Sequence, residues 1–376
     1  MERIYLDHNA TTPLDPVVRA EMEEWLGERP ANASSLHAFG EEARKAIARA
    51  RERVAALVGA RPDEIVFVGG GTEANNLAIL GAFLAAGDGR VITTTFEHQS
   101  VLGPCHHVQR MGGSLTLVPV DSNGMVQPER VLAALTDDTV LVSVMLANNE
   151  VGTIQPVHAL ARALRGRRLV LHTDAVQAVG KMSVDVDELG VDLLSMSAHK
   201  FGGPKGVGAL YVRRGTKVSP ILFGGHQERG LRPGTENVAG IVGFGKACEL
   251  VRARLETDIF QMLKLRNAFE EGIVGKIPGT KINGAGAHRL PNTSNIYFDG
   301  VSGETLVIAL DLMGLAASTG AACHERDTKP SHVLMAMGRT PEEARSCVRF
   351  SFGREQVDVA RAIELVAQAV GRLRGQ

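Results

Sequence analysis

Hydrophobic and polar positions form two kinds of block along the chain. Residues 40–58 carry apolar side chains at helical intervals, which predicts an amphipathic helix. From about residue 65 to 213, short apolar runs alternate with helical patterns across short loops. Because a buried parallel strand is apolar on both faces and is followed by a helical crossover, this alternation predicts a mainly parallel sheet covered by helices.

The second half of the chain has a different pattern. Residues 256–275 predict a long helix that links two domains. After it come strand-like NTSNIYFDG, helical ETLVIALDLMG, a short helix near 341–347, strand-like VRFSFGR and a final helix at 355–374. We therefore expect a large α/β domain over 15–255 and a smaller α+β domain over 256–376, joined by the extended residues 1–14.

Polar or ionisable side chains follow five of the predicted strands. The segments are EIVFVGGGTEANN, VITTTFEHQSV, VLVSVMLANNEVG, RRLVLHTDAVQAVG and LLSMSAHKFGGPKG. In an open α/β sheet, ligands bind beyond the carboxyl ends of the strands. These side chains are therefore expected to meet at one site.

Lys200 follows the apolar run of the last segment and is the first candidate catalytic residue. A lysine at the end of a buried strand can be desolvated, which leaves a nucleophilic amine. Such amines form Schiff bases with carbonyl substrates and with pyridoxal phosphate (PLP). A solvated lysine at a strand end is the alternative, and the neighbouring segments favour the first interpretation.

Two of those segments complete a minimal PLP site. Glycines in GGGTEANN at 69–76 would let a phosphate approach a helix N-terminus, where Thr72 could add a hydroxyl. Asp174 could keep the pyridine nitrogen protonated, His98 could stack on the ring, and Gln177 could bond to the ring oxygen. A plain glycine turn with Thr72 as N-cap, and Asp174 as a helix cap, are the structural alternatives.

Composition and charge narrow the class of protein. The 376 residues are enough for two domains, and 41 basic against 42 acidic residues give a net charge of −1, so nothing indicates a nucleic-acid or membrane surface. The start, MERIYLDHNATT, lacks the apolar segment of a signal peptide, and no apolar run could span a bilayer. A cytoplasmic protein is expected.

The four cysteines form no CxxC pair, so neither a metal site nor a disulfide framework is expected. Cys105, Cys248 and Cys347 lie among apolar or small residues, as inert packing residues do. Cys323 lies instead in a small, polar segment, ASTGAACHERDTKPSH, where His324, Arg326 or Lys329 could favour its thiolate.

Taken together, the motifs resemble the NifS/IscS-type cysteine desulfurases, which are class-V, fold-type I PLP enzymes. The resemblance covers nearly the whole chain, in order, through YLDHNATTPLDP, NASSLHAFG, GGTEANN, EHQSVL, NNEVG, TDAVQ, SAHKFGGPKG, RPGTEN, STGAACH and VRFSFGR. It implies a fold-type I PLP transferase with a mixed, mainly parallel sheet in its large domain.

The resemblance also implies a role for each matching residue. Lys200 would bind PLP covalently, His98 would stack on the ring, Asp174 would pair with the ring nitrogen, and Gln177 and Asn149 would contact the oxygen side. Residues for the cofactor phosphate would be Gly71, Thr72, Ser197 and His199, together with Thr235 from the partner in a homodimer. Arg349, helped by Asn149, would bind the substrate carboxylate, and Cys323 would receive the sulfur as a persulfide.

The implied reaction converts L-cysteine to L-alanine, with the sulfur passing to an acceptor protein for iron–sulfur clusters or another sulfur-containing cofactor. A selenocysteine lyase, or a degenerate PLP-fold sulfur carrier or assembly protein, are the alternatives. An aminotransferase is less favoured, because transamination would not require a reactive thiol at Cys323. Many IscS-type members have a longer C-terminal tail than VGRLRGQ, which helps to dock the scaffold, so the mode of docking stays open.

Overall fold

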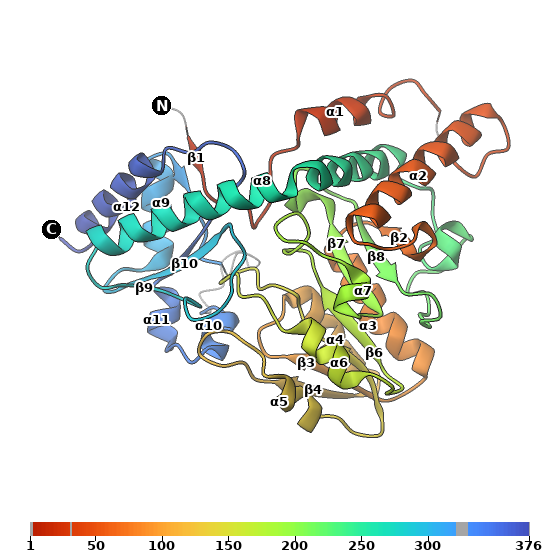
Figure 1. Ribbon diagram of the computed structural model, residues 1–376, viewed down its shortest axis with the longest axis horizontal. Helices are drawn as coiled ribbons and strands as arrows, with labels where there is room; N and C mark the ends of the chain where they lie inside the picture. The colour runs from red at the N-terminus through yellow and green to blue at the C-terminus, as the bar shows by residue number, and fades with distance from the viewer. Residues whose placement is uncertain (1–2, 31, 321–329, 376) are drawn as a thin grey trace.

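The computed structural model of the chain describes residues 3–30, 32–320 and 330–375. At its centre lies a seven-stranded sheet with the strand order β2-β8-β7-β6-β5-β3-β4 (Figure 1). In that order the strands are β2 (Ile65–Val68), β8 (Gly208–Val212), β7 (Leu193–Ser197), β6 (Val170–Asp174), β5 (Thr139–Ser143), β3 (Arg90–Thr94) and β4 (Ser114–Val118).

Strand β8 is antiparallel to both of its neighbours, β7 and β2, and the other neighbouring pairs in this sheet are parallel. The mainly parallel sheet predicted from the alternation of apolar runs and helical patterns is thereby confirmed. Because β7, β6, β5 and β3 are adjacent and parallel, their carboxyl ends lie along one edge of the sheet.

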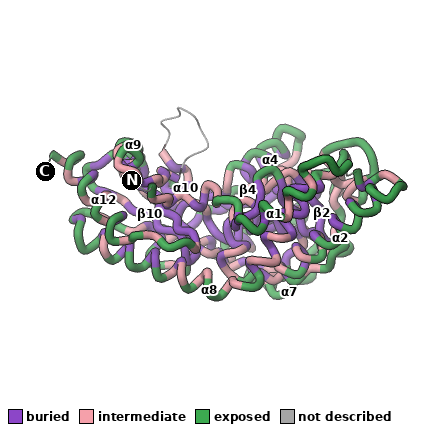
Figure 2. Tube along the Cα trace, turned by 90° about the horizontal axis from the view of Figure 1, so that it is seen from above, coloured by how far each residue is buried: buried purple, intermediate pink, exposed green. Residues whose placement is uncertain are grey.

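Alternate residues of each strand pack into two different hydrophobic clusters. In β2, Ile65 and Phe67 belong to the cluster on one face, whereas Val66 and Val68 belong to the cluster on the other. Burial of both faces explains why these strands appear in the sequence as continuous apolar runs. Figure 2 shows the buried segments gathered along the middle of the molecule, between helices whose outer faces are exposed.

Helices cover both faces of the sheet. One layer contains α3 and α4, and the other contains α2, α6, α7 and the first half of a long helix, α8. The helices before α8 are α1 (Pro16–Glu23), α2 (Ala38–Leu57), α3 (Gly71–Ala86), α4 (Gln99–Arg110), α5 (Pro128–Ala133), α6 (Val157–Leu164) and α7 (Val186–Leu189). Short 3-10 turns are η1 (Pro62–Glu64), η2 (Ala198–Lys200) and η3 (Gln227–Gly230).

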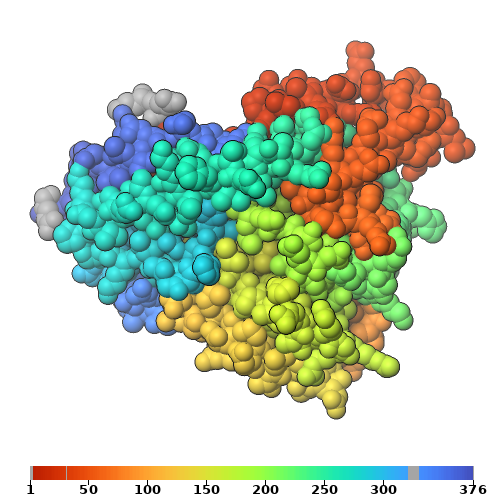
Figure 3. All heavy atoms as spheres, viewed as in Figure 1, coloured from red at the N-terminus to blue at the C-terminus, as the bar shows by residue number. Residues whose placement is uncertain are grey.

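Helix α8 (Val238–Lys276) runs for 39 residues along the surface, from the N-terminal helices to the C-terminal part of the chain (Figure 3). The sequence pattern predicted only 256–275. The first half was missed because it is buried on most sides and has no amphipathic period. Gly245 allows this half to approach α2 closely, since a Cβ there would lie 2.6 Å from the Cα of Ala50.

The C-terminal part has its own hydrophobic cluster, in which Phe269 of α8 packs against Phe350 and Phe352. Its antiparallel sheet has the order β12-β10-β9. Strand β1 (Ile4–Tyr5) pairs with β11, and Leu6 joins the cluster. The elements after α8 are β9 (Thr280–Ile282), β10 (Thr293–Phe298), α9 (Gly303–Leu312), β11 (Leu315–Ala316), α10 (His332–Ala336), α11 (Pro341–Arg345), β12 (Cys347–Ser351) and α12 (Val359–Leu373).

Candidate active site

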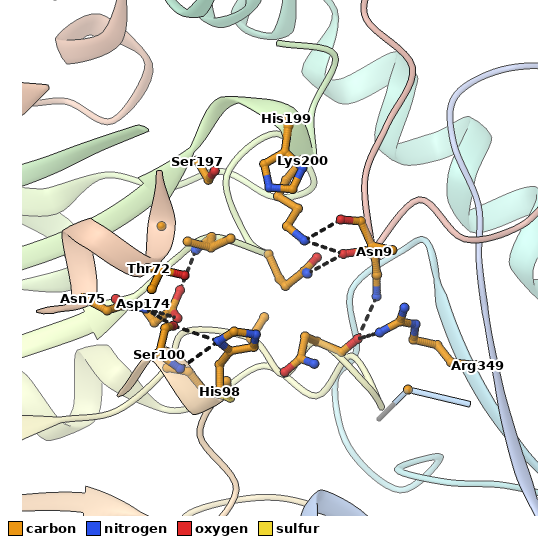
Figure 4. A pocket seen from close by; sticks show the side chains of 18 residues that line it. Asn9, Thr72, Asn75, His98, Ser100, Asp174, Ser197, His199, Lys200 and Arg349 are labelled. Carbon is orange, nitrogen blue, oxygen red and sulfur yellow. Dashed lines mark hydrogen bonds between the residues drawn. The ribbon is translucent and has the colours of Figure 1, made fainter. Parts of the chain in front are cut away.

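A cavity of about 300 Å³ lies beyond the carboxyl ends of the parallel strands (Figure 4). Its lining comes from the five segments that the sequence singled out, from the N-terminal segment and from β12. The expected site residues that line it are Gly71, Thr72, His98, Asn149, Asp174, Gln177, Ser197, His199, Lys200 and Arg349. Side chains from distant parts of the sequence thus line one cavity.

Lys200 is the last residue of η2, directly after the buried strand β7. Its half-buried side chain reaches back to the N-terminal segment, where Nζ donates to the carbonyl oxygens of Asn9 at 2.7 Å and Ala10 at 2.9 Å. These two acceptors hold the amine at the wall of the cavity. A carbonyl carbon bound in the cavity would therefore lie within reach of a fixed nitrogen.

Asp174 ends β6 and is buried at the opposite side of the cavity. Oδ1 accepts from the backbone N–H of Val176 at 2.9 Å, and Oδ2 accepts from Asn75 Nδ2 at 2.7 Å. A carboxylate held by two donors can still accept from a third, such as a protonated ring nitrogen. Asn75 is fully buried on α3, and its amide also donates to Ser100 at 2.8 Å.

His98 is the N-cap of α4, and its Nδ1 accepts from the backbone N–H of Ser100 at 3.1 Å. The hydroxyl of Ser100 lies 2.7 Å from the same nitrogen. Burial lowers the pKa of His98, and the positive charge of Lys200 acts in the same direction although Asp174 opposes both. A neutral imidazole with Nδ1 as acceptor carries its proton on Nε2.

Glu97, next to His98, is completely buried. Its carboxyl accepts from Thr94 Oγ1 at 2.7 Å and from the backbone N–H of Met145 at 3.0 Å. Burial raises the pKa of Glu97 to about 8. The contact ties the loop after β3 to the loop after β5, and so fixes the backbone that presents His98.

The wall of the cavity at the start of α3 suits a phosphate. Gly71 and Thr72 begin α3, whose first turn has N–H groups without intrahelical acceptors and the positive end of the helix dipole. A Cβ at position 71 would lie 2.8 Å from Val176 Cγ2, so any larger residue there would displace Val176. Ser197 and His199 complete this end of the lining. Burial lowers the pKa of His199 to about 4, so its ring is neutral and its Nδ1 lies 3.1 Å from Thr11 Oγ1.

Arg349 enters the cavity from β12 and is almost fully buried. Nη2 pairs with Asp7 at 2.7 Å, and Nη1 donates to the carbonyl oxygen of Asn149 at 3.0 Å. Among the described residues, Arg349 Nε and Asn149 Oδ1 are buried without a hydrogen-bond partner. Unpaired buried polar atoms are unfavourable, so these two atoms mark where a polar ligand would bind.

Four residues that the sequence analysis did not assign to the site belong to this geometry. Asn9 bonds to Lys200 and Gln177, and Asn75 and Ser100 link Asp174 to His98. Asp7 pairs with Arg349. A local signal existed for Asn75 only, because it is a polar residue on the buried, apolar face of α3.

Two residues that were expected in the active site are not among the described residues that line the cavity of the single chain. Thr235 is exposed, in the loop before α8. Cys323 lies outside the described residues, although Gly320 just before it contributes to the lining. Cys105, Cys248 and Cys347 are buried, as predicted, and burial raises the pKa of each thiol, that of Cys347 to about 11.

The cavity therefore contains what a PLP site requires. It offers an amine, a carboxylate for the ring nitrogen, a helix N-terminus for the phosphate and a buried guanidinium for a carboxylate. The described residues contain no group of three or more His, Cys, Asp or Glu side chains that could hold a metal ion. Among the helices that the structure describes, none combines the length and the hydropathy of a membrane span.

Comparison with known proteins places the chain among close relatives. The sequence profile of the class-V aminotransferases matches residues 4–359. A cysteine desulfurase IscS from Dictyoglomus turgidum is 46% identical over 375 residues, which are 99% of this chain and 95% of the relative. A solved structure of a NifS-like protein has a TM-score of 0.90 and 37% identity, covering 99% of this chain and 98% of that one. Another solved structure, SspA in complex with cysteine, has a TM-score of 0.83 and 34% identity, covering 94% of this chain and 100% of that one.

Proposed function

The chain belongs to the class-V aminotransferase family and is a cysteine desulfurase, and we propose that its activity resides in the cavity beside Lys200. The fold is the fold-type I fold of PLP-dependent enzymes, as expected from the sequence. One observation carries the proposal. Lys200, Asp174, His98 and Arg349 converge from four different elements on one cavity, in the combination that PLP-dependent chemistry on an amino acid needs.

Membership of this family implies PLP, and the cavity fits it. When bound, PLP supplies an electron sink that accepts the charge left when the Cα proton of an amino acid is removed. Lys200 would hold the cofactor covalently, and Asp174 would keep the ring nitrogen protonated. His98 would cover the ring face, while Gln177 and Asn149 would contact the ring oxygen. The phosphate would be bound by Gly71, Thr72, Ser197 and His199.

In this scheme Lys200 also moves the substrate proton. The Lys200 amine lies at the cavity wall, 2.7 Å from the carbonyl oxygen of Asn9. When this amine is free, it would face a substrate bound in the cavity. The amine can then remove the Cα proton and return it elsewhere on the substrate, as a general acid–base does. The two backbone carbonyls accept from the amine and keep it pointed into the cavity.

The sulfur leaves the substrate by attack of the Cys323 thiolate. A new S–S bond forms between Cys323 and the substrate sulfur while the substrate Cβ–S bond breaks. The carbon gains a proton and becomes the methyl group of alanine, and Cys323 becomes a persulfide. Cysteine plus enzyme thiol thus becomes alanine plus enzyme persulfide, and no external oxidant or reductant is consumed.

Arg349 would bind the substrate carboxylate and so set the orientation of cysteine. Its planar guanidinium is held by Asp7 and by the Asn149 carbonyl, so little conformational entropy is lost when a ligand binds. Asn149, which lines the same cavity, would help by donating its side-chain amide N–H to the carboxylate. The persulfide would then pass to an acceptor protein for the synthesis of iron–sulfur clusters or another sulfur-containing cofactor.

The test of this function is alanine release from L-cysteine by the PLP-loaded protein. With a reductant present, we expect equimolar alanine and sulfide. Arg349→Gln should raise KM for cysteine by roughly 100-fold, the loss expected for one charged hydrogen-bonding partner, with a smaller effect on kcat. Arg213→Gln, which removes an arginine paired with Asp187 outside the cavity, should leave KM unchanged. If the wild type released no alanine, the proposed function would be refuted. An unchanged KM in Arg349→Gln would refute the binding of the substrate carboxylate by Arg349.

We also propose the division into a large unit, 15–255, and a smaller one formed by 1–14 and 256–376. Two features support it. Leu6 and the second half of α8 belong to the hydrophobic cluster of the C-terminal part, and strand β1 pairs with β11. The cavity then lies between the units, with Lys200 on one and Arg349 on the other.

A homodimer is the proposed assembly, with Thr235 of one subunit reaching the cofactor phosphate of the other. Thr235 is exposed here, and exposed apolar side chains occur in the same loop at Phe223 and before α2 at Leu36. Phe223 is 86% exposed and Leu36 98% exposed, and large apolar side chains so exposed suggest a surface that is covered in the assembly.

Sedimentation should therefore show a dimer, and Phe223→Asp should shift it toward monomer and release PLP. The reason is that a charge would be buried at the interface and the partner contact to the phosphate would be lost. Thr257→Asp, which introduces the same charge at an exposed polar position on α8, serves as the control and should leave the dimer intact. A fully active monomer in the wild type would contradict this assembly.

A further inference from the structure

A second lysine lies buried behind the active site. Lys181 lies four residues after Gln177 in the sequence and is only 3% exposed. Its Nζ donates to Gln177 Oε1 at 2.8 Å and to the backbone carbonyl of Gln177 at 3.1 Å. Neither acceptor is a carboxylate. Burial of a lysine without an acidic partner is unfavourable, so this arrangement needs a compensating role.

The surroundings of Lys181 form a separate small cavity of about 50 Å³. The ionisable residues that line it with Lys181 are His8, Lys200, Asp258, Arg354 and Glu355. Burial lowers the pKa of Lys181 well below its usual value, and the charges of Lys200 and Arg349 act in the same direction. These effects favour the neutral amine, which still has two N–H donors for its two acceptors.

The hydrogen bonds around Gln177 leave one orientation for its amide. Lys181 donates at one end, so the oxygen of the amide must face Lys181. At the other end, Gln177 Nε2 donates to the carbonyl oxygen of Asn9 at 2.9 Å, which can only accept. The reversed amide would place two acceptors, Gln177 Oε1 and the Asn9 carbonyl oxygen, against each other. The second N–H of Nε2 remains available to the large cavity, which Gln177 lines.

Asn9 alone would hold this orientation weakly. Its carbonyl oxygen contacts only the nitrogen end of the amide, and when the Lys200 amine is free it is shared with Lys200 Nζ at 2.7 Å. Without Lys181, the oxygen of the Gln177 amide would be buried and unpaired, and the side chain would turn away to satisfy it. The contact at 2.8 Å with Lys181 is therefore what keeps the amide N–H facing the cavity.

We propose that Lys181 is a positioning residue that holds the Gln177 amide as a hydrogen-bond donor to the ring oxygen of PLP. The inference rests on the proposed role of Gln177 at that oxygen. A donor there stabilises negative charge on the ring oxygen, and so opposes retention of a proton on the Lys200 nitrogen that is joined to the cofactor. Lys181 thus adjusts the proton affinity at Lys200 without touching cofactor or substrate.

The test is a pH titration of the visible absorption of the PLP-loaded protein, in wild type and in Lys181→Met. Methionine fills a similar volume and removes the donors, so the variant should fold. We expect the midpoint of the spectral transition to rise by roughly one pH unit, the size of one lost hydrogen bond, and PLP to dissociate several-fold more readily. Lys264→Met, at an exposed position on α8, should shift neither quantity. If Lys181→Met does not accumulate, Lys181→Leu removes the same donors.

A double-mutant cycle with Gln177→Ala separates the positioning role from a general structural one. Gln177→Ala should shift the midpoint upward by itself, and Lys181→Met should add nothing in that background. If Lys181→Met leaves the midpoint unchanged while Gln177→Ala raises it, the inference is overturned and the role of Gln177 stands. If its shift persists in the Gln177→Ala background, Lys181 acts directly and the inference is also overturned. If Gln177→Ala has no effect, the role of Gln177 fails and the inference with it.

Discussion

Lys200→Ala is expected to abolish covalent attachment of PLP and to reduce cysteine turnover by roughly 1,000-fold or more. Both effects have one cause, because the same amine would hold the cofactor and move the substrate proton. The variant should still fold, since Lys200 is only half-buried and lines a cavity of about 300 Å³ that has room for water in place of its amine.

The measurement is borohydride reduction followed by peptide mapping. In the wild type, reduction should bleach the visible band and leave the cofactor fixed to the peptide that contains Lys200. In Lys200→Ala no lysine should retain it, and Lys205→Ala, an exposed lysine of the following loop, should behave as the wild type does. Cofactor fixed at another lysine in Lys200→Ala would contradict the assignment, and Lys181 is the position to examine first, because it lines the small cavity next to Lys200.

The sequence predicted the sheet well for a physical reason. Strands buried on both faces are continuous apolar runs, and crossover helices such as α4 and α6 have a clear 3.6-residue period. Helix α2 was predicted at 40–58 and lies at Ala38–Leu57, since one of its faces is exposed and the other is buried. The final helix was predicted at 355–374 and lies at Val359–Leu373 for the same reason.

Elements without such a period were missed or misplaced. The first half of α8, from Val238, is buried on most sides, and Gly245 allows contact with α2 rather than marking a loop. The predicted helix near 341–347 ends at Arg345, because Cys347 begins β12 and pairs with Tyr297. The antiparallel direction of β8 could not be deduced from its apolar pattern, which does not differ from that of the parallel strands in the same sheet.

Site residues that directly follow a strand could be predicted from the sequence. Site residues whose role depends on contacts with distant parts of the chain could not. Asp174, His98 and Lys200 all follow apolar runs, so one rule about strand ends finds them. Asn9 lies 191 residues before Lys200, and nothing local in its segment indicates that its carbonyl accepts from that amine. The Lys181–Gln177 contact is local in the sequence, but its meaning depends on Asn9 at the other end of the amide.

Cys323→Ser should keep PLP and still bind cysteine, but lose sulfide and alanine production by about 100-fold to 10,000-fold. Cofactor and substrate binding should survive because Lys200, Asp174 and Arg349 are unchanged. Turnover should fail because the thiolate that attacks the substrate sulfur is gone, and a serine hydroxyl is a far weaker nucleophile at neutral pH. The spectral change on addition of cysteine measures the first step, and alanine release measures the second.

The three other cysteines are natural controls for this prediction. Cys105, Cys248 and Cys347 are buried, and burial raises the pKa of each thiol, so none supplies a thiolate at neutral pH. Cys105→Ser should therefore retain turnover if it folds, and mass spectrometry of cysteine-treated wild type should find the added sulfur on the Cys323 peptide alone. Turnover at the wild-type rate in Cys323→Ser would mean that sulfur leaves by elimination. The enzyme would then release sulfide directly and have no persulfide to offer an acceptor protein.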